Sequence, residues 1–187
     1  MKDAESSIKK LNKIDLDDVK NVGTKGTSEA VKKVKFGDQY IKVNGKKTLR
    51  TNVEYETGEG YKYITDTNGR ISKVEANLEL GKADRNSYAQ RVVGREDRLP
   101  NDDGGHLIAS IFNGSGNLDN LVPMNSTLNR GEYKVLENTW KKALNEIPPK
   151  KVEVKIRPIY EGTSSRPVRF KIDYKIDGVK YSDMLTN

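Results

Sequence analysis

The chain contains a single histidine, His106, within the turn-rich run 101–109 (NDDGGHLIA). Because one imidazole cannot build a cage of several histidines around a metal ion, His106 is the leading candidate for a proton acceptor at neutral pH. Asn129 and Glu137 follow it on the C-terminal side. Amide and carboxylate oxygens suit a hard cation such as magnesium, which keeps several of its waters. Together these residue types could activate a water and hold a divalent ion.

The segment 126–147 must position Asn129 and Glu137. Its apolar residues recur at intervals of three and four, which predicts a helix with one buried face that is ended by the two following prolines. On such a helix Asn129 and Glu137 lie about 80° apart around the axis. Both can then face one site, and Lys141 continues the same edge. Taken singly, Asn129 could instead be a cap or turn residue, and Glu137 with Lys141 could be an ordinary surface pair.

Short alternating apolar runs dominate residues 31–80 and predict an antiparallel meander. Asn44-Gly45 and Asn68-Gly69 lie between these runs, and Asn-Gly favours tight hairpin turns because both residues tolerate positive φ.

The region from residue 83 onward mixes helical and extended patterns. In order it predicts a short helix at 85–91, a turn-forming run at 100–105 with the strand bearing His106, and a short apolar strand at 118–124. The long helix at 126–147 and two more strands at 152–156 and 168–174 follow. We therefore expect one α+β domain over 31–187, with its core motif at 83–147. Residues 1–30 are assigned to an N-terminal helical or linker segment, because their loosely helical spacing is rich in charge and interrupted at 24–27.

Composition narrows the function classes. The 187 residues include 34 Lys and Arg against 27 Asp and Glu, a formal charge of +7. Such a surface attracts polyanions, although charge alone is common among proteins that bind no nucleic acid. The absence of cysteine excludes disulfides, thiolate chemistry and Cys-rich zinc sites. No stretch approaches the length needed to span a bilayer, so we expect no membrane segment, and the first residues have no apolar signal core.

The order Asp-x-Gly-His, Asn-Leu-x-Pro, then Asn-Arg with a glutamate eight residues after that asparagine, resembles one family. It is similar to the DNA/RNA non-specific endonucleases of the ββα-metal superfamily, and within them to the C-terminal nuclease domains of bacterial LXG-type polymorphic toxins secreted by type VII systems. The resemblance runs from about Lys73 to the C-terminus. The matching stretches are 85–90 (RNSYAQ), 105–109 (GHLIA), 114–125 (GSGNLDNLVPMN) and 128–130 (LNR). The resemblance implies an α+β fold, which is an antiparallel sheet with a ββα-metal nuclease core and flanking helices.

The resemblance also implies roles at matching positions. His106 takes the place of the general base, Asn129 that of the direct ligand to one Mg²⁺ or Mn²⁺ ion, and Glu137 that of the carboxylate holding metal-bound water. Asn120 matches an asparagine that supports the motif, and Asp103 is a second supporting candidate. In this one-metal mechanism the imidazole deprotonates the attacking water while the ion stabilises the opposite oxygen. The resemblance implies that the substrate is DNA, and RNA could also be cut because no 2′-hydroxyl is required.

One position departs from the family pattern, because Gly104 stands where the family often has an arginine. The arginines that could replace it at the phosphate are Arg91, Arg95, Arg98 and Arg130. The candidates for binding nucleic acid at the site are Arg91, Arg98, Arg130 and Lys141. Further cations that could track a backbone are Lys142, Lys150, Lys151, Arg157, Arg166 and Arg169.

The resemblance places the domain in a biological setting. It implies the toxic part of a larger secreted bacterial protein that acts in the cytoplasm of a target cell, together with a cognate immunity protein, which we expect to be acidic. Two other classes stay open. A non-catalytic basic module that binds nucleic acid would not need His106. A hydrolase with a Ser-His-Asp arrangement is less well supported, because no nucleophile-elbow pattern is present.

Overall fold

The computed structural model of the protein describes residues 29–187, and residues 31–187 form one unit. The helical or linker segment expected at 1–30 lies almost entirely outside the described residues. Within them, no helix combines the length and the apolar character that crossing a membrane requires.

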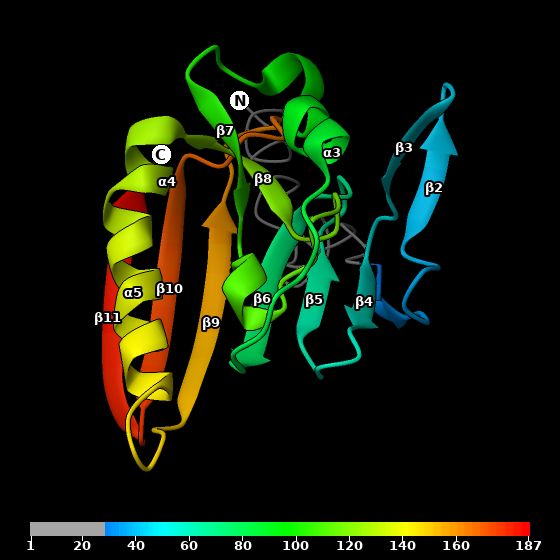
Figure 1. Ribbon diagram of the computed structural model, residues 1–187. Coiled ribbons are helices and arrows are strands. Elements are labelled where there is room, and N and C mark those ends of the chain that lie inside the picture. Colours follow the sequence, from blue (N-terminus) through cyan, green and yellow to red (C-terminus); the bar gives the residue numbers. More distant parts are fainter. Residues whose placement is uncertain (1–28) are drawn as a thin grey trace, which may run out of the picture. The chain divides into compact units, whose positions relative to one another are not determined.

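A seven-stranded sheet forms the base of the described unit, in the order β1-β4-β5-β6-β9-β10-β11 (Figure 1). Its strands are Lys32–Lys33 (β1), Val53–Glu56 (β4), Lys62–Thr65 (β5), Ile71–Asn77 (β6), Val152–Ile159 (β9), Arg169–Ile176 (β10) and Val179–Thr186 (β11). Neighbouring strands are antiparallel except β1 and β4, which are parallel. The expected antiparallel sheet is confirmed, with this one parallel pair added.

The predicted hairpin turns form, and β4, β5 and β6 make an antiparallel meander as predicted, but the first two strands of the region stand apart from it. Asn44 and Gly45 take positive φ between β2 (Tyr40–Val43) and β3 (Lys46–Leu49), which pair only with each other. Both strands are largely exposed and rich in lysine. They stand as a separate hairpin, whose Leu49 and Tyr40 still pack against the main core.

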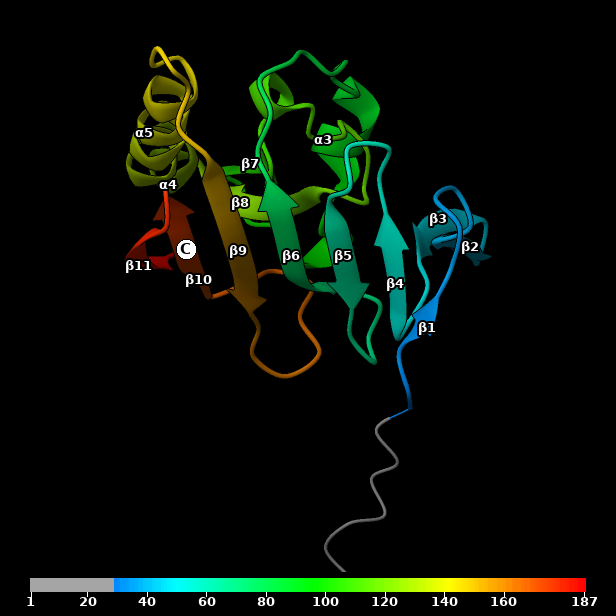
Figure 2. The same ribbon diagram turned by 90° about the horizontal axis from the view of Figure 1, so that it is seen from below.

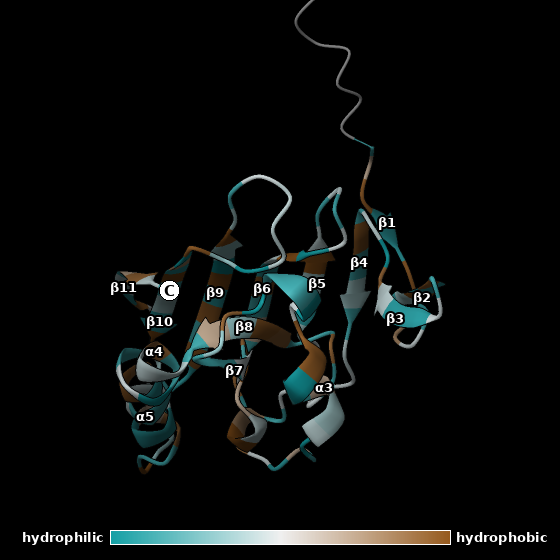
Figure 3. Cartoon of the chain, turned by 90° about the horizontal axis from the view of Figure 1, so that it is seen from above, coloured by the Kyte–Doolittle hydropathy of each residue, from teal (hydrophilic) through white to brown (hydrophobic). Residues whose placement is uncertain are grey.

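The remaining elements all lie on one side of the sheet (Figures 1–3). They are α3 (Ser87–Val92), η1 (Arg95–Asp97), β7 (Asp102–His106), η2 (Ser110–Phe112), β8 (Leu121–Asn125), α4 (Ser126–Arg130) and α5 (Glu132–Leu144). β7 and β8 form an antiparallel pair, so that β7, β8 and α4 supply the expected ββα core of an α+β fold.

Hydrophobic burial joins this layer to the sheet. β8 is hydrophobic in Figure 3, and its residues from Leu121 to Met124 are all buried. On α5 the apolar stripe faces the sheet, where Trp140 is 1% exposed and its ring lies 5.6 Å from that of Tyr174. The catalytic candidates therefore stand on elements fixed by the main core.

The prediction of a single helix over 126–147 is wrong, because this segment forms two helices that meet at Gly131. A Cβ atom there would lie 2.5 Å from the carbonyl oxygen of Thr127, so this close approach of backbone to backbone requires glycine. Asn129 is on α4 and Glu137 is on α5. The angle of about 80° calculated for one continuous axis therefore does not apply.

Candidate active site

A cavity of about 720 Å³ opens between α3, β7 and the α4–α5 pair. It is lined by Arg85, Ser87, Gln90, Arg91, Arg98, Asp103, Gly104, His106, Ala109, Ser110, Ile111, Asn129, Arg130, Lys134 and Glu137. The break at Gly131 does not separate the two helical candidates, because both α4 and α5 reach this space. The cavity thus brings together His106, Asn129 and Glu137, as well as Asp103.

His106 ends β7, and the next residue is fixed from two sides. The Leu107 amide donates to the carbonyl oxygen of Asn120 at 2.9 Å, and the Tyr133 hydroxyl donates to the Leu107 carbonyl oxygen at 2.8 Å. The His106 Nε2 atom is buried and has no hydrogen-bond partner in the described part of the chain. Burial, aided by the positive charge of Arg85, lowers the pKa of His106 to about 4. The imidazole is therefore neutral across the physiological pH range.

Asn120 is fully buried beneath the histidine loop and uses its whole amide. Its oxygen accepts from the Tyr63 hydroxyl at 2.8 Å and from the Ile108 amide at 3.0 Å. Its nitrogen donates to the carbonyl oxygens of Ile108 at 2.8 Å and Ser115 at 2.7 Å. These four bonds tie the loop that follows His106 to the core, since an unmade bond at any of these buried groups would be costly.

Asp103 orients Asn129. The Asn129 amide nitrogen donates to Asp103 Oδ2 at 2.9 Å, and the Arg130 guanidinium donates to both oxygens of the same carboxylate at 3.0 and 2.7 Å. Burial alone would raise the pKa of Asp103, but the bonds from Arg130 and Asn129 hold it below its usual value. Because the Asn129 nitrogen is bound to Asp103, the opposite end of the amide, its oxygen, is left for a ligand.

Glu137 is a nearly buried carboxylate on the cavity wall, with its side chain 10% exposed. Burial raises its pKa, and this effect is opposed by Lys134, whose Nζ lies 3.3 Å from Glu137 Oε2. A buried carboxylate with one lysine partner is expensive to keep charged. A further cation in the cavity would lower that cost.

The donor set fits one hard divalent ion. Within residues 29–187, no group of three or more His, Cys, Asp or Glu side chains is arranged to hold a metal. The cavity instead offers the oriented amide oxygen of Asn129 and the carboxylate of Glu137. Magnesium takes oxygen ligands, is often bound through one or two protein groups, and keeps several waters. An arrangement of few protein ligands in a cavity of this size suits that preference.

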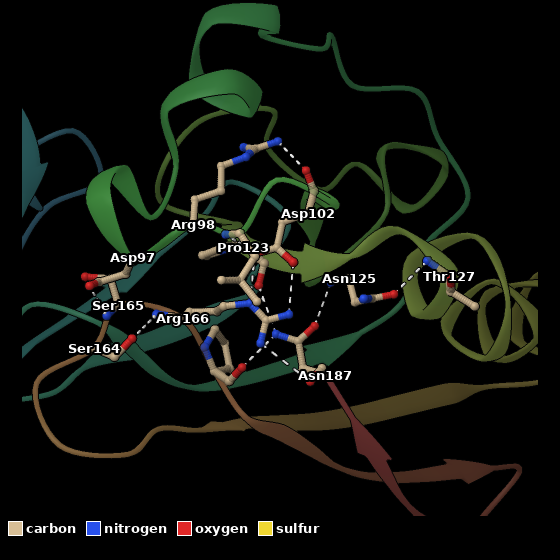
Figure 4. A network of polar contacts seen from close by, with 12 residues as sticks. Asp97, Arg98, Asp102, Pro123, Asn125, Thr127, Ser164, Ser165, Arg166 and Asn187 are labelled. Carbon is tan, nitrogen blue, oxygen red and sulfur yellow. Dashed lines mark hydrogen bonds and ion pairs between the residues drawn. The ribbon is translucent and has the colours of Figure 1, made fainter.

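The opposite side of β7 holds a network of polar contacts (Figure 4). The Arg166 guanidinium donates to both oxygens of Asp102, at 2.8 and 2.9 Å, and these side chains are 12% and 0% exposed. The Asn187 side chain accepts from the Asn125 amide at 2.7 Å and donates to the Pro123 carbonyl oxygen at 3.1 Å. Asn125 also caps α4, accepting from Thr127 N at 2.9 Å. The network joins β7, β8 and the start of α4.

The model of the family described as DNA/RNA non-specific endonuclease matches residues 51–178 of this chain. The matched segment contains the whole cavity. The chain belongs to this family. The chain is also similar to a secretion-system protein and to a solved structure.

The type VII secretion system protein EssD of Staphylococcus aureus, in strains USA300 and NCTC 8325 / PS 47, is 48% identical over 155 residues. The match covers 78% of this chain but 24% of the relative, so the chain spans about a quarter of the length of these curated relatives. The crystal structure of NucA from Streptococcus agalactiae, with no metal bound, matches with a TM-score of 0.54 at 18% identity. That match covers 79% of this chain and 82% of NucA, and it supports the shared fold.

Gly104 stands where the family resemblance led us to expect an arginine, and α3 packs closely against it. A Cβ atom at Gly104 would lie 2.5 Å from both the Cα and the carbonyl oxygen of Gln90. No side chain fits there unless α3 moves away from β7. Helix α3 itself lines the cavity, so positively charged side chains can face the site from α3 in place of β7.

The cations expected at the phosphate differ in how they are used. Arg98 donates to the carbonyl oxygens of Gln90 and Asp102 and so holds α3 to β7. Arg130 is bound to Asp103. Arg91 lines the cavity and makes no hydrogen bond or ion pair through its side chain within residues 29–187.

Sequence reasoning missed Arg85, which lines the cavity and is close enough to lower the pKa of both His106 and Glu137. It makes no side-chain hydrogen bond or ion pair to the rest of the described chain. The sequence feature that could have pointed to Arg85 is its position at the start of stretch 85–90, which matches the family. Arg95 does not line this cavity, and its guanidinium instead donates to the Lys47 carbonyl oxygen at 3.3 Å.

Several lysines and arginines expected along the substrate lie elsewhere. Lys141 is exposed on α5 but does not line the cavity, where Lys134 is found instead. Arg166 is buried against Asp102 and is not available to a backbone. Arg157 and Arg169 alternate with buried residues that face the helical layer, so they lie on the opposite face of the sheet from the cavity.

The remaining expected cations are also partly engaged. Lys150 and Lys151 pair with Glu146 at 3.1 Å and Glu153 at 3.2 Å, and Lys142 is exposed near the end of α5. Like Lys141, none of the three lines the cavity. The positive charge that faces the candidate site therefore comes mainly from α3 and its flanks.

Proposed function

We propose that this domain is a divalent-metal-dependent endonuclease that hydrolyses phosphodiester bonds of DNA and RNA without sequence specificity. The observation that carries the proposal is the grouping in one cavity of a neutral, unpartnered histidine and an asparagine whose amide is oriented by a carboxylate. Membership of the endonuclease family supports the same chemistry.

His106 acts as the general base. A base must be unprotonated at the working pH, and burial keeps the imidazole neutral. The ring lines the cavity. It can therefore take the proton of an attacking water. Asn120 and Tyr133 hold the adjoining main chain, which fixes where the ring stands relative to substrate.

Asn129 would hold the ion through its amide oxygen, and Glu137 would hold it through water. When bound, a magnesium or manganese ion supplies positive charge to the scissile phosphate and the departing oxygen. Asp103 fixes the Asn129 amide so that its oxygen, and not its nitrogen, is offered. The charged form of Glu137, disfavoured by burial, is the form that suits this task.

Arg85 and Arg91 would contact the phosphates of the bound strand. Both line the cavity, and neither has a side-chain partner in the described part of the chain. They stand in for the arginine that Gly104 cannot supply. Arginine suits this task because its planar guanidinium can donate two hydrogen bonds to one phosphate.

The similarity to part of EssD supports a place in a longer protein. We propose that the domain is the antibacterial toxin portion of a protein secreted by a type VII system and acts in the cytoplasm of a target cell. A cognate immunity protein would then cover the cavity, and the cations around it favour an acidic partner.

The proposal is tested by incubating the purified protein with supercoiled plasmid and with a structured RNA. Each substrate receives magnesium, manganese or a chelator. We expect cleavage of both substrates with either metal, loss of cleavage with the chelator, and products with 5′-phosphate and 3′-hydroxyl ends. Binding of both nucleic acids without cleavage under any metal condition would replace this proposal with a non-catalytic binding module.

A further inference from the structure

A second groove lies on the other side of α3 from the catalytic cavity. Its volume is about 230 Å³, and it runs between α3 and the β2–β3 hairpin. Among the residues that line it are Tyr40, Lys42, Lys46, Lys47, Tyr88 and Arg95. α3 therefore forms a wall of both spaces, since Ser87, Gln90 and Arg91 face the catalytic cavity.

The groove is cationic. Its wall carries three lysines and one arginine, and no carboxylate among the described residues lines it. Lys42 makes no side-chain ion pair within residues 29–187. Lys47 Nζ lies 3.8 Å from the centre of the Tyr40 ring, and Arg95 bonds to a main-chain oxygen. Lys46 is the exception, because it pairs with Glu96 at 3.1 Å. Three of the four cations are thus left to attract an anion.

An exposed aromatic ring stands beside these cations. Tyr88 is 60% exposed on α3, while its neighbour Ala89 is buried and anchors the helix. A single exposed tyrosine is ordinary on a protein surface. Next to Lys42, Lys47 and Arg95, however, it completes the combination that binds single strands without sequence preference, which is a cationic groove for the backbone and an aromatic face for a base.

We propose that this groove binds the nucleic-acid strand a few nucleotides away from the scissile phosphodiester. A base would stack on Tyr88, and Lys42, Lys47 and Arg95 would contact the adjoining phosphates. The inference rests on the proposed endonuclease function, since it extends the substrate path out of the catalytic cavity. An α-helix with its side chains is about 10 Å across. At roughly 3.4 Å of rise per stacked nucleotide along one strand, the two sites are about three nucleotides apart.

The test separates binding from cleavage. Affinity for a labelled 12-nucleotide single strand is measured by fluorescence anisotropy, in chelator, using protein that carries His106→Ala in every sample. Into this background are placed Tyr88→Ala, Tyr88→Phe, and the double change Lys42→Ala with Lys47→Ala. The matched control is Lys175→Ala with Lys180→Ala, an exposed cross-strand lysine pair outside both spaces. Thermal unfolding confirms that each variant is folded.

We expect Tyr88→Ala to raise Kd about tenfold, through loss of a base stack, while Tyr88→Phe keeps the stack and stays within about twofold. The lysine pair in the groove should raise Kd and reduce the slope of log K against log salt by about 1.4, twice the value for one single-strand phosphate contact. The control pair should reduce the slope by less than half of that.

The inference is overturned if Tyr88→Ala changes Kd by less than twofold, or if the groove and control lysine pairs behave alike. These outcomes do not depend on catalysis. Failure of the proposed function would appear separately, as the absence of metal-dependent cleavage by the unaltered protein. A length series adds a second readout, because unaltered protein should cleave 12-nucleotide strands with a lower KM than 4-nucleotide strands, and Tyr88→Ala should remove that difference.

Discussion

Asp102 and Asp103 are neighbours on β7, yet they face opposite sides of the strand and meet different surroundings. Asp102 is 6% exposed and accepts two bonds from Arg166 and one from the Leu99 amide at 2.9 Å. Asp103 lines the cavity, where it holds Asn129 and an Arg130 side chain that is 74% exposed. Strand alternation sends one carboxylate into the scaffold and the other into the site.

The two sides differ in how completely their polar groups are bonded. In the network around Asp102, charged and amide groups meet partners within the protein, which stabilises the fold and fixes the position of β7. Around Asp103 several groups are left free for a ligand, among them Arg85, which precedes α3, and Arg91, which lies on it. Unsatisfied polar groups beside a fully bonded scaffold are what a preorganised site requires.

The largest expected effect comes from breaking the scaffold side. Arg166→Met leaves Asp102 buried without its charged partner, so the free energy of unfolding should fall by about 3–5 kcal/mol in urea denaturation. Arg157→Met is the matched control, because it breaks a pair with Asp173 whose side chains are 45% and 35% exposed. The control should lose about 1 kcal/mol or less. Equal losses of unfolding free energy in the two variants would show that the buried and the exposed ion pair contribute alike to stability.

On the site side the effect should fall on activity and not on stability. Asp103→Ala removes the group that orients Asn129, which should raise the magnesium concentration for half-maximal cleavage and lower activity by about 10–100-fold. Unfolding free energy should change by less than about 1 kcal/mol, because the bonded Arg130 is largely exposed.

Arg130→Gln serves as the control for Asp103→Ala, since it keeps the Asp103–Asn129 bond and should change the magnesium requirement less. A loss of stability in Asp103→Ala as large as in Arg166→Met, with an unchanged magnesium requirement, would show that both aspartates serve the scaffold.

Sequence reasoning succeeded where the signal is local. The turn at Asn44-Gly45 takes the positive φ that these residue types favour, and the hairpin forms there. The grouping of His106, Asn129 and Glu137 followed from a family resemblance, and the cavity does bring the three together.

The failures are all set by tertiary contacts. The apolar pattern of 126–147 continues across Gly131, so it could not reveal that the backbone of Thr127 comes too close for a side chain. Nothing local distinguishes Arg166, which is buried in an ion pair, from arginines that face solvent. Arg85 reaches the cavity because α3 packs against Gly104, a contact between segments distant in sequence.

Removing a free cation from the site should have a moderate effect. Arg85→Gln takes away a phosphate contact and should reduce kcat/KM by about tenfold. It should also raise the pKa of His106, because the charge of Arg85 lowers it. Arg95→Gln provides a comparison outside the catalytic cavity and should leave the His106 titration unchanged. A loss in kcat/KM without any shift of the acid limb of the pH profile would place Arg85 away from the imidazole.

The pH dependence should be the smallest effect. Because the pKa of His106 is lowered to about 4, the base stays neutral as the pH falls from 7.5 to 5.5. Protonation of His106 should therefore change kcat/KM by less than about twofold over that range at saturating magnesium, whereas an ordinary histidine near pKa 6.5 would lose about tenfold. An acid limb centred near pH 6.5 would show that the imidazole is solvated and not buried.

One comparison shows whether His106 is the base of a metal-dependent nuclease. Plasmid cleavage in magnesium is measured for the unaltered protein and for His106→Ala, alongside DNA affinity for both in chelator. We predict a loss of about 10²–10⁴-fold in kcat for the variant, with Kd unchanged within about twofold. Cleavage by His106→Ala at more than a tenth of the unaltered rate would contradict the account.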